Sequence, residues 1–331
     1  MEEENGEFEL EKVHYGDSME LSKKLEDEIF KLTLFSPPYA SQIDYDGKGL
    51  GKIKPDQYVD WIRPLIKELH RVLVNDGVFV LNMSNVVIDG FIHPYKRKTI
   101  NLIIDEFGFK ELDLNHWIKP STQDMREPTR NITEDIHVFT KTEKYTYNFE
   151  NVSIEYSEET LKRYKSPFYK KDKKTGERKK IWRLPKEIGA LPTNTVYFPS
   201  DKKKSKQHPA PFPISLPIRY ILAFSNENDI VFDPFSGSGT TFEASKGLKR
   251  RFLGFEANEK FIGISNSNVE KMPEGKLLEE HKKERENMKK KIKRQIQEIL
   301  EIQISKGRND DIAREYSNRK AEGLVEEKEV S

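Results

Sequence analysis

The sequence predicts an α/β protein built on a doubly wound, mostly parallel β-sheet. Short apolar segments alternate with amphipathic ones along most of the chain, which is typical of strands and helices that follow one another in such a sheet. Residues 230–241 (IVFDPFSGSGTT) join an apolar strand to a helix through a glycine-rich turn, as nucleotide-binding units of this class do. A second apolar strand then ends at Glu256.

The first half of the chain supplies four strands and two helices. Val59, Ile62, Ile66, Leu69 and Leu73 recur at helical spacing, so we expect a helix over Pro55–Leu73 with a kink at Pro64. A second helix is expected at Thr99–Phe107. The strands are expected at Lys31–Phe35, Gly77–Met83, Lys110–Lys119 and Ile136–Lys141, the last two as an antiparallel pair that closes one edge of the sheet.

The regular alternation stops at about Thr142 and returns after Gln207. Helices are then expected at Ser215–Phe224, Thr240–Leu248 and Asn258–Glu270, with strands at Ile230–Phe232 and Phe252–Phe255. Beyond Pro273, lysine and glutamate dominate. We expect there a solvated amphipathic helix through Met288, Ile292, Ile296 and Ile299, followed by a polar tail to Ser331. A dimer contact or an additional binding arm is the alternative.

Charge is distributed unevenly along the chain. The whole protein has a net charge of only +1, yet residues 161–206 contain 16 Lys or Arg and 4 Asp or Glu, a local net charge of +12. A neutral protein with one concentrated basic segment indicates a local contact with a polyanion. The chain contains no cysteine, which excludes disulfides, thiolate metal sites and any mechanism with a cysteine nucleophile.

The sequence gives no sign of a membrane protein or of a metal site. No apolar run approaches the length of a transmembrane helix, and the first residues (MEEENGEFEL) are too acidic and polar for a signal peptide. We therefore expect a cytoplasmic protein without membrane contact. The seven histidines show no metal-ligand spacing, so no metal is expected.

The turn after Asp233 predicts a nucleoside site. Gly237 and Gly239 allow a tight turn and a close approach of the backbone to a ligand. Glu256 follows Gly237 at about the spacing at which an acid meets ribose hydroxyls. The turn contains no basic residue, which favours a positively charged nucleoside over a polyphosphate. S-adenosyl-methionine fits, since Asp233 could pair with its amino group. A merely structural glycine-rich turn is the alternative.

A second motif, Ser36-Pro37-Pro38-Tyr39, follows the first strand directly. Two prolines restrict the backbone, so the Ser36 hydroxyl and the Pro37 carbonyl can accept both hydrogens of an –NH2 group. The lone pair of a base amine is delocalised into the ring, and acceptors placed for a tetrahedral nitrogen would favour its attack on a methyl group. Tyr39 offers a flat face on which an extruded base could stack. A proline-stiffened turn is the alternative for this motif alone.

Together these residues resemble the motifs of DNA amino-methyltransferases. The order of the two motifs, catalytic before cofactor-binding, resembles the beta group of that family, and the resemblance covers roughly residues 12–140 and 206–272. Tyr15-Gly16-Asp17-Ser18, His208-Pro-Ala-Pro-Phe-Pro213 and Gly254-Phe-Glu256 resemble further cofactor-binding segments of the family. The resemblance implies a Rossmann-like S-adenosyl-methionine-dependent methyltransferase fold with permuted motif order. It implies that the cofactor contacts Asp17, His208, Pro211, Phe212, Asp233, Phe235, Gly237, Ser238, Gly239, Thr240, Thr241 and Glu256.

Serine at the first catalytic position is typical of the N4-cytosine enzymes within that family. The resemblance therefore implies that Ser36, Pro37, Pro38 and Tyr39 methylate N4 of a flipped cytosine in duplex DNA, with N6 of adenine as the alternative. Methylation at carbon 5 of cytosine is excluded, because it needs a thiol. A methyltransferase for RNA or a protein amide, and a catalytically silent DNA-binding module, are alternatives of other classes. The family also implies a prokaryotic restriction-modification system, a cognate endonuclease and a monomer or homodimer.

The basic stretch lies where this family keeps its target recognition region. We expect phosphate and base contacts there from Arg163, Lys165, Lys170, Lys171, Arg178, Arg183, Lys202 and Lys203. A solvated charged loop is the alternative. The expected division of the chain is a catalytic half (1–141), the target recognition region (142–207), a cofactor-binding half (208–272) and a charged helical extension (273–331). The glycine-rich loop Ala40–Gly51 is expected to become ordered on DNA or cofactor.

Overall fold

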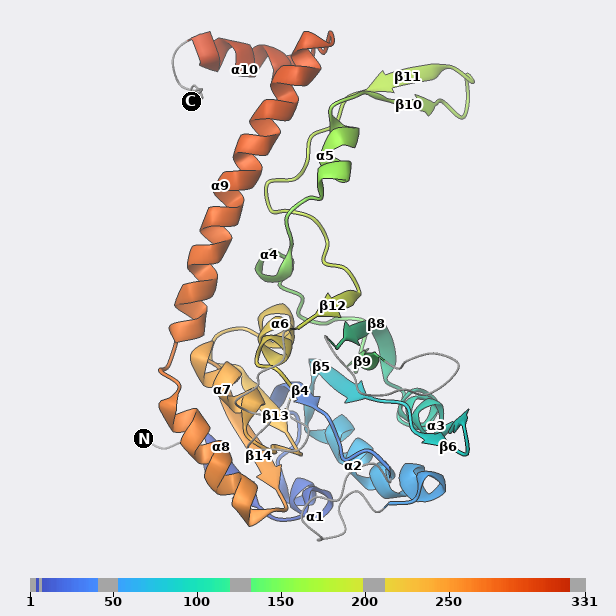
Figure 1. Cartoon of the computed structure of the whole chain (residues 1–331), viewed down its shortest axis with the longest axis vertical. Coiled ribbons are helices and arrows are strands. Elements are labelled where there is room, and N and C mark those ends of the chain that lie inside the picture. The colour runs from blue at the N-terminus through green and yellow to red at the C-terminus, as the bar shows by residue number, and fades with distance from the viewer. Residues whose placement is uncertain (1–3, 6–7, 41–52, 120–131, 199–211, 322–331) are drawn as a thin grey trace. The chain divides into compact units, whose positions relative to one another are not determined.

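The structure is a computed structural model that describes residues 4–5, 8–40, 53–119, 132–198 and 212–321 (Figure 1). The chain forms two compact units. Unit 1 comprises residues 1–152 and 193–281, and unit 2 comprises residues 153–192 and 282–331. Each unit therefore joins segments that are far apart in the sequence. No helix among the described residues is long and apolar enough to cross a membrane.

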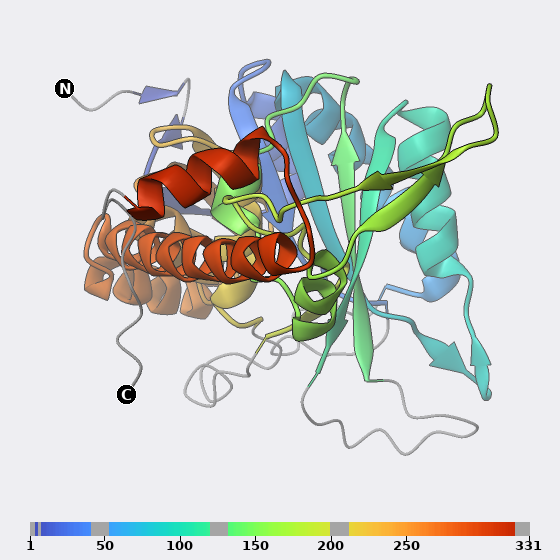
Figure 2. The same cartoon turned by 90° about the horizontal axis from the view of Figure 1, so that it is seen from above.

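Unit 1 is built on a mixed sheet whose described strands run in the order β12-β8-β9-β5-β4-β13-β14-β3. All neighbours pair in parallel except at β9, which is antiparallel to both β5 and β8 (Figure 2). The strands of this sheet are β3 (Lys12–Tyr15), β4 (Phe30–Phe35), β5 (Leu73–Met83), β8 (Lys110–Ile118), β9 (Thr133–Thr140), β12 (Thr195–Tyr197), β13 (Ile230–Asp233) and β14 (Arg251–Glu256). The predicted doubly wound, mostly parallel fold is confirmed.

Helices cover both faces of this sheet (Figure 1). Their bounds are α1 (Ser18–Leu21), α2 (Tyr58–Val72), α3 (Tyr95–Asn101), α4 (Phe149–Val152), α6 (Ser215–Phe224), α7 (Thr240–Gly247) and α8 (Glu259–Lys271). Short helical turns stand at Ser22–Lys24 and Pro55–Gln57, and two small hairpins pair β1 (Glu4–Asn5) with β2 (Phe8–Glu9) and β6 (Val87–Ile88) with β7 (Phe91–Ile92).

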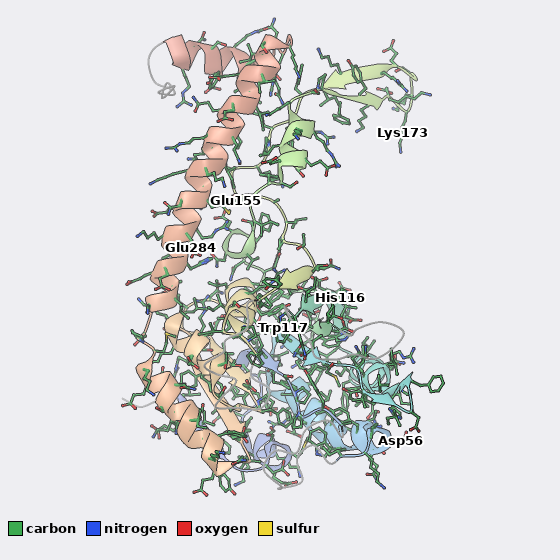
Figure 3. The ribbon with its side chains drawn as sticks, viewed as in Figure 1. Asp56, His116, Trp117, Glu155, Lys173 and Glu284 are labelled. Atoms are coloured by element: carbon green, nitrogen blue, oxygen red, sulfur yellow. The ribbon has the colours of Figure 1, made fainter. Side chains whose placement is uncertain are left out.

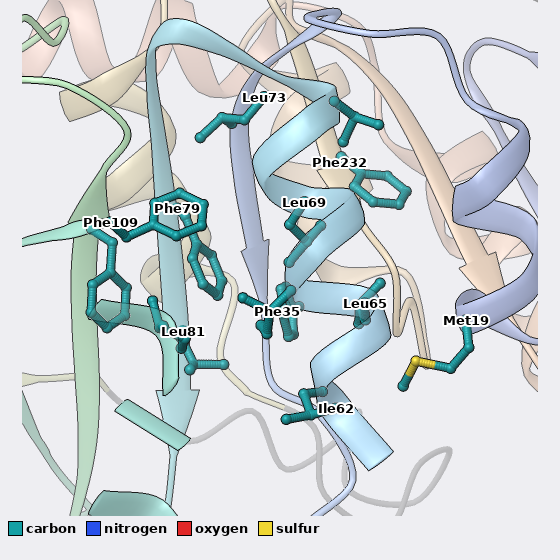
Figure 4. Packing of buried hydrophobic residues seen from close by; sticks show 14 of the residues in the cluster. Met19, Phe35, Ile62, Leu65, Leu69, Leu73, Phe79, Leu81, Phe109 and Phe232 are labelled. Carbon is teal, nitrogen blue, oxygen red and sulfur yellow. The ribbon is translucent and has the colours of Figure 1, made fainter. Parts of the chain in front are cut away.

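The alternation of side chains along the central strands explains the two layers of helices. In β5, Phe79 and Leu81 belong to the cluster that packs on α2, while Val78 and Val80 belong to the cluster that packs on α6 and α7. Successive residues of a strand point to opposite faces, so a central strand buried on both sides is apolar throughout. Figure 4 shows the first cluster, in which residues of α2 such as Leu65 and Leu69 lie against the sheet.

Several expectations for unit 1 are corrected. The strand expected from Ile136 begins at Thr133, and it does pair with β8 as predicted. That pair does not close the sheet edge, because the three-residue strand β12 pairs in parallel outside β8. The helix expected at Thr99–Phe107 is instead α3 followed by a π-helical turn at Leu102–Glu106, so it begins one turn earlier, just after Pro94.

Unit 2 combines the basic segment with the charged C-terminal helices. Its elements are α5 (Glu158–Tyr164), β10 (Phe168–Lys171), β11 (Arg178–Ile181), most of α9 (Lys276–Ser305) and α10 (Asp311–Ala321). Arg285 of α9 donates to the Ser153 and Ile188 carbonyls, and Gln303 donates to those of Tyr164 and Arg183. Backbone carbonyls of the irregular segment are thus satisfied by side chains of a distant helix.

Two expectations for this part of the chain are corrected as well. Helix α9 is not simply solvated, since Ile292 and Ile299 are fully buried, which places the predicted apolar stripe against the rest of unit 2. The predicted polar tail contains α10, which is capped by Asp310 accepting from the Ala313 N–H (3.0 Å) and anchored by buried Ala313. The weak periodicity of a short polar helix explains why the sequence did not reveal it.

Candidate active site

The two sequence motifs meet at one edge of the sheet. Strands β4 and β13 are parallel neighbours, with Leu32 beside Val231 and Thr33 beside Phe232. Both strands therefore end at the same edge, where β4 continues into Ser36 and β13 ends at Asp233. In open α/β sheets, ligands bind outside the carboxyl ends of such strands.

A pocket opens at this edge, with a volume of about 650 Å³ that includes the open space at its mouth. Its lining comes from the ends of β3, β4, β13 and β14 and from the helices that follow them. The lining residues are Asp17, Ser18, Ser36, Pro38, Trp61, Pro234, Phe235, Gly237, Glu256, Ala257, Asn258 and Phe261.

Glu256 lies at the end of β14 with both carboxylate oxygens held in place. Its Oε2 accepts from the Gly237 N–H and its Oε1 from the Asn258 N–H, each at 2.8 Å. Burial raises the pKa of the Glu256 carboxyl, while these backbone bonds oppose that shift. A carboxylate oxygen can accept more than one hydrogen bond, so this side chain can also receive hydrogen bonds from hydroxyl groups.

Asp233 lies behind the glycine-rich turn and is 1% exposed. Its Oδ1 accepts from the Phe235 N–H (2.9 Å) and its Oδ2 from the Thr241 hydroxyl (2.6 Å). Burial raises the pKa of the Asp233 carboxyl to about 7. Asp233 is not among the residues that line the pocket, and its predicted pairing with an amino group stays a prediction.

The glycine-rich turn packs too closely for side chains. Gly239 has φ +81°, and a Cβ atom there would lie 2.2 Å from the Ser265 hydroxyl and 3.0 Å from Ser265 Cα. A Cβ atom on Gly254 would lie 2.1 Å from the Phe242 ring. The glycines thus allow the turn to approach α8 and the β14 backbone, as the sequence predicts for such units.

Replacing Gly239 by alanine is expected to lower the free energy of unfolding by about 3 kcal/mol, because positive φ and overpacking each add a cost. Gly263→Ala is the matched control. Gly263 is exposed in α8 with nothing within 4 Å of its Cβ position, so alanine there should be neutral or slightly stabilising. Urea unfolding of the two variants measures the difference, and equal stabilities would contradict the close approach of this turn to α8.

Asp17 lies at the carboxyl end of β3, beside Glu256 of β14. The Gly16 N–H donates to the Glu256 carbonyl (3.0 Å), and the Asp17 side chain caps α1 by accepting from the Met19 N–H (2.9 Å). The Ser18 hydroxyl donates to the Pro234 carbonyl. Residues that the sequence places far apart thus line one side of the pocket together.

The motif after β4 belongs to a buried polar cluster. The Ser36 and Tyr39 hydroxyls are 2.9 Å apart, and Tyr39 donates to Glu134 Oε2 (2.9 Å). Asn82 Nδ2, at the end of β5, lies within 3.3 Å of Ser36 Oγ, 3.0 Å of Tyr39 Oη and 2.7 Å of Glu134 Oε2. Tyr39 is 8% exposed and does not line the pocket, whereas Ser36 and Pro38 do. Its predicted role as a stacking face stays a prediction.

The other predicted cofactor residues lie in three settings. Phe235 lines the pocket, and the centre of its ring lies 5.5 Å from that of Phe35 and 6.0 Å from that of Trp61. Ser238 is buried in the turn, and Thr240 and Thr241 are buried at the start of α7. Phe212 packs against the apolar cluster around α6. His208, Pro211 and the loop 41–52 lie outside the described residues.

Sequence reasoning missed several residues of this site. Trp61, Asn258 and Phe261 line the pocket, and Asn82 and Glu134 surround the Tyr39 hydroxyl. The sequence could have identified Asn82 as a site residue, since it is the one amide in the apolar strand Gly77–Met83. It could not have identified Glu134, because this residue lies before the first residue of the strand that the sequence predicted.

The predicted DNA-contacting residues of unit 2 are mostly exposed. In the hairpin β10–β11, Lys170 pairs with Lys179 and Lys171 with Arg178. The Arg183 guanidinium lies 3.7 Å from the centre of the Phe168 ring, and Arg163 is paired with Glu159 (2.5 Å). Lys173, in the turn of this hairpin, is labelled in Figure 3. Lys202 and Lys203 lie outside the described residues.

Comparison with known proteins agrees with the arrangement of this site. The family described as DNA methylase (N6_N4_Mtase) matches residues 30–267, which include both motifs. The chain belongs to this family. Among its relatives, the type II methyltransferase M.PvuII of Proteus hauseri is 26% identical over 277 residues, which cover 76% of this chain and 82% of the relative. The DNA adenine methyltransferase YhdJ of Escherichia coli K12 is 29% identical, covering 77% of this chain and 81% of the relative. The chain is thus a DNA methylase of the amino-methyltransferase type.

Solved structures of DNA methylases share the fold. The cytosine-N4-specific PvuII DNA methyltransferase superposes with a TM-score of 0.60 at 21% identity, covering 85% of this chain and 91% of that one. TTHA0409 of Thermus thermophilus, described as a putative DNA modification methylase complexed with S-adenosyl-L-methionine, gives a TM-score of 0.55 at 21% identity, covering 79% and 94%. The Rossmann-like methyltransferase fold is confirmed by these similarities.

Proposed function

We propose that this DNA methylase is site-specific and transfers a methyl group from S-adenosyl-methionine to the N4 amine of cytosine in duplex DNA. The observation that carries the proposal is a shared pocket, lined by Ser36 and Pro38 on one side and by Pro234, Phe235 and Gly237 on the other. A group that binds the glycine-rich turn is thereby brought beside the serine of the other motif. Proximity of this kind is a large part of what an enzyme contributes to a transfer reaction.

The residues of the pocket fit S-adenosyl-methionine. Glu256 is held at the pocket by backbone N–H groups of Gly237 and Asn258, and its carboxylate would accept hydrogen bonds from the ribose hydroxyls. Phe235 and Trp61 offer aromatic faces to a positively charged group. Asp17, Asp233 and the turn from Gly237 to Thr241 complete the proposed binding site, with the segment 208–213 over the methionine end. When bound, this cofactor supplies an electrophilic methyl group.

Ser36 and Pro37 are proposed to hold the target amine. The base must leave the duplex to reach them, because its amine is otherwise engaged in pairing. Acceptance of the amine hydrogens by the Ser36 hydroxyl and the Pro37 carbonyl would favour the pyramidal nitrogen that attacks the methyl group. The proton on nitrogen can leave after transfer, so no general base is needed before the attack.

Unit 2 is proposed to contact the DNA. Lys170 faces Lys179 and Lys171 faces Arg178 across β10 and β11, and like charges directly opposite one another destabilise a strand pair. Asp172, ion-paired with Lys179 (3.6 Å), offsets part of this repulsion. A polyanion would relieve this repulsion, and phosphates of the duplex are the natural source in a DNA methylase. We assign the target recognition region to this unit, with Arg163, Lys165 and Arg183 as further contacts.

A second candidate function is N6-adenine methylation, because this chain is similar both to a cytosine-N4-specific DNA methyltransferase and to a DNA adenine methyltransferase. Ser36 favours cytosine. The type II relatives support a role as the modification enzyme of a restriction-modification system, acting as monomer or homodimer alongside a cognate endonuclease.

Incubation with unmethylated duplex DNA and labelled S-adenosyl-methionine, followed by digestion to nucleosides, is expected to yield labelled N4-methylcytosine. The identification of the labelled nucleoside by mass spectrometry is the measurement. Labelled N6-methyladenine would make the second candidate correct. Label in structured RNA but not in competing duplex DNA, or no turnover at all, would overturn the proposal.

A further inference from the structure

Glu134 is a buried carboxylate that the proposed reaction does not yet use. It lies in β9, and its Oε2 receives hydrogen bonds from the Tyr39 hydroxyl (2.9 Å) and from Asn82 Nδ2 (2.7 Å). Its other oxygen, Oε1, is ion-paired with Lys119. Both oxygens therefore act as acceptors, and the carboxylate contacts the Ser36 motif through Tyr39.

This environment fixes the direction of the hydrogen bonds. Tyr39 has one hydroxyl hydrogen, and a carboxylate can only accept, so that hydrogen goes to Glu134. Burial, and then the negative charge of Glu134, raise the pKa of Tyr39 well above its usual value, so Tyr39 keeps its proton. The Tyr39 oxygen can then only accept in its 2.9 Å contact with Ser36, which makes Ser36 the donor.

The orientation of Asn82 agrees with this direction. Its Nδ2 faces three oxygens, those of Ser36, Tyr39 and Glu134. Rotation of the amide would place an oxygen against the Glu134 carboxylate, so the donor must face the cluster. Asn82 therefore adds a donor and takes no hydrogen from Ser36.

We propose that Glu134 is a positioning residue that, through Tyr39, makes the Ser36 hydroxyl an acceptor toward the pocket. The single hydrogen of Ser36 is directed to Tyr39, which leaves a lone pair of Ser36 for an N–H of the target amine. Without Glu134, Tyr39 could donate to Ser36 and occupy that lone pair. This inference rests on the proposed function and identifies Glu134 as the residue that orients the Ser36 hydroxyl.

Replacing Glu134 by alanine is expected to lower the single-turnover rate of methyl transfer by about ten- to a hundredfold, with KM for DNA unchanged. Glu134→Gln keeps an acceptor oxygen for Tyr39 and is expected to recover most of the rate. In a Tyr39→Phe background, the Glu134→Ala change should have no further effect, because the hydroxyl through which it acts is gone. Independent effects would instead multiply.

The matched control is Asp135→Asn. Asp135 is the next residue of β9 and is also ion-paired, with Lys96 (2.5 Å) and His116 (2.9 Å), which lie outside the Ser36 motif. The Asp135→Asn variant should transfer methyl groups at the rate of the unsubstituted protein. Thermal melts of all variants verify that they fold. Two results would overturn this inference but leave the proposed function standing. One is full activity of both Glu134 variants, and the other is that the rate losses of Glu134→Ala and Tyr39→Phe multiply in the double variant. Absence of transfer to DNA by the unsubstituted protein would overturn the proposed function with it.

Discussion

Replacing Ser36 by alanine is expected to lower the rate of methyl transfer by about 10²–10³-fold while leaving cofactor affinity unchanged. The size corresponds to the loss of one preorganised hydrogen-bonding group from a site that acts on the transition state. Ser36 lines the pocket, and its hydroxyl is the only part that the substitution removes. Single-turnover transfer of labelled methyl groups measures the chemical step separately from product release.

Ser22→Ala is the matched control for this experiment. Ser22 lies buried in unit 1, and its hydroxyl has no hydrogen-bond partner among the described residues. Removing it should affect neither the transfer rate nor stability. Equilibrium binding of labelled cofactor to each variant tests whether the Ser36→Ala effect lies in chemistry. A Ser36→Ala protein with full activity would contradict the assignment of Ser36 as acceptor of the amine.

Asp233→Asn is expected to change stability and cofactor binding in opposite directions. Burial raises the pKa of Asp233 from 3.8 to about 7, so between these values the folded state holds a proton that the unfolded state has lost. Stability therefore falls as pH rises through this window, and the loss is complete above about pH 8. Asparagine does not titrate. The free energy of unfolding of the Asp233→Asn variant, relative to that of the unsubstituted protein, should therefore grow by about 4 kcal/mol from pH 4 to pH 8.

The same variant is expected to bind S-adenosyl-methionine about tenfold or more weakly at pH 8, because the proposed partner of the cofactor ammonium loses its charge. Urea unfolding across this pH range and equilibrium dialysis are the two measurements. Asp229→Asn, just before β13, is the control for binding and should leave the affinity for the cofactor unchanged. Parallel stability curves would contradict the effect of burial, and unchanged affinity would contradict the pairing.

The fold could be predicted where the sequence is strongly periodic. Strands β4, β13 and β14 and helices α6 and α8 lie within about a turn of their expected positions, because buried strands and capped helices carry clear patterns. The edge strand β12 could not be predicted. Three residues in an irregular stretch have no period, and their place beside β8 is set by tertiary pairing.

The site could be predicted as far as its backbone motifs but not its side-chain network. Ser36 and Gly237 each belong to a motif that the sequence revealed at the end of a predicted strand, and they line one pocket. Glu134 could not be expected at Tyr39, since nothing in the sequence gives the register of β9 against β5. Likewise, helical spacing predicted α9, but its pairing with the basic segment depends on contacts between distant residues such as Gln303 and Arg183.

The pairing of β4 with β13 has a consequence for how the protein assembles. The sheet is completed at its centre only when segments separated by most of the chain have been synthesised and brought together. Closing so long a loop is entropically costly before its contacts form, so domains of this kind acquire structure slowly. The apolar strands β4 and β5 therefore stay partly uncovered on the ribosome, and a chain interrupted before residue 230 has an open sheet edge available for aggregation.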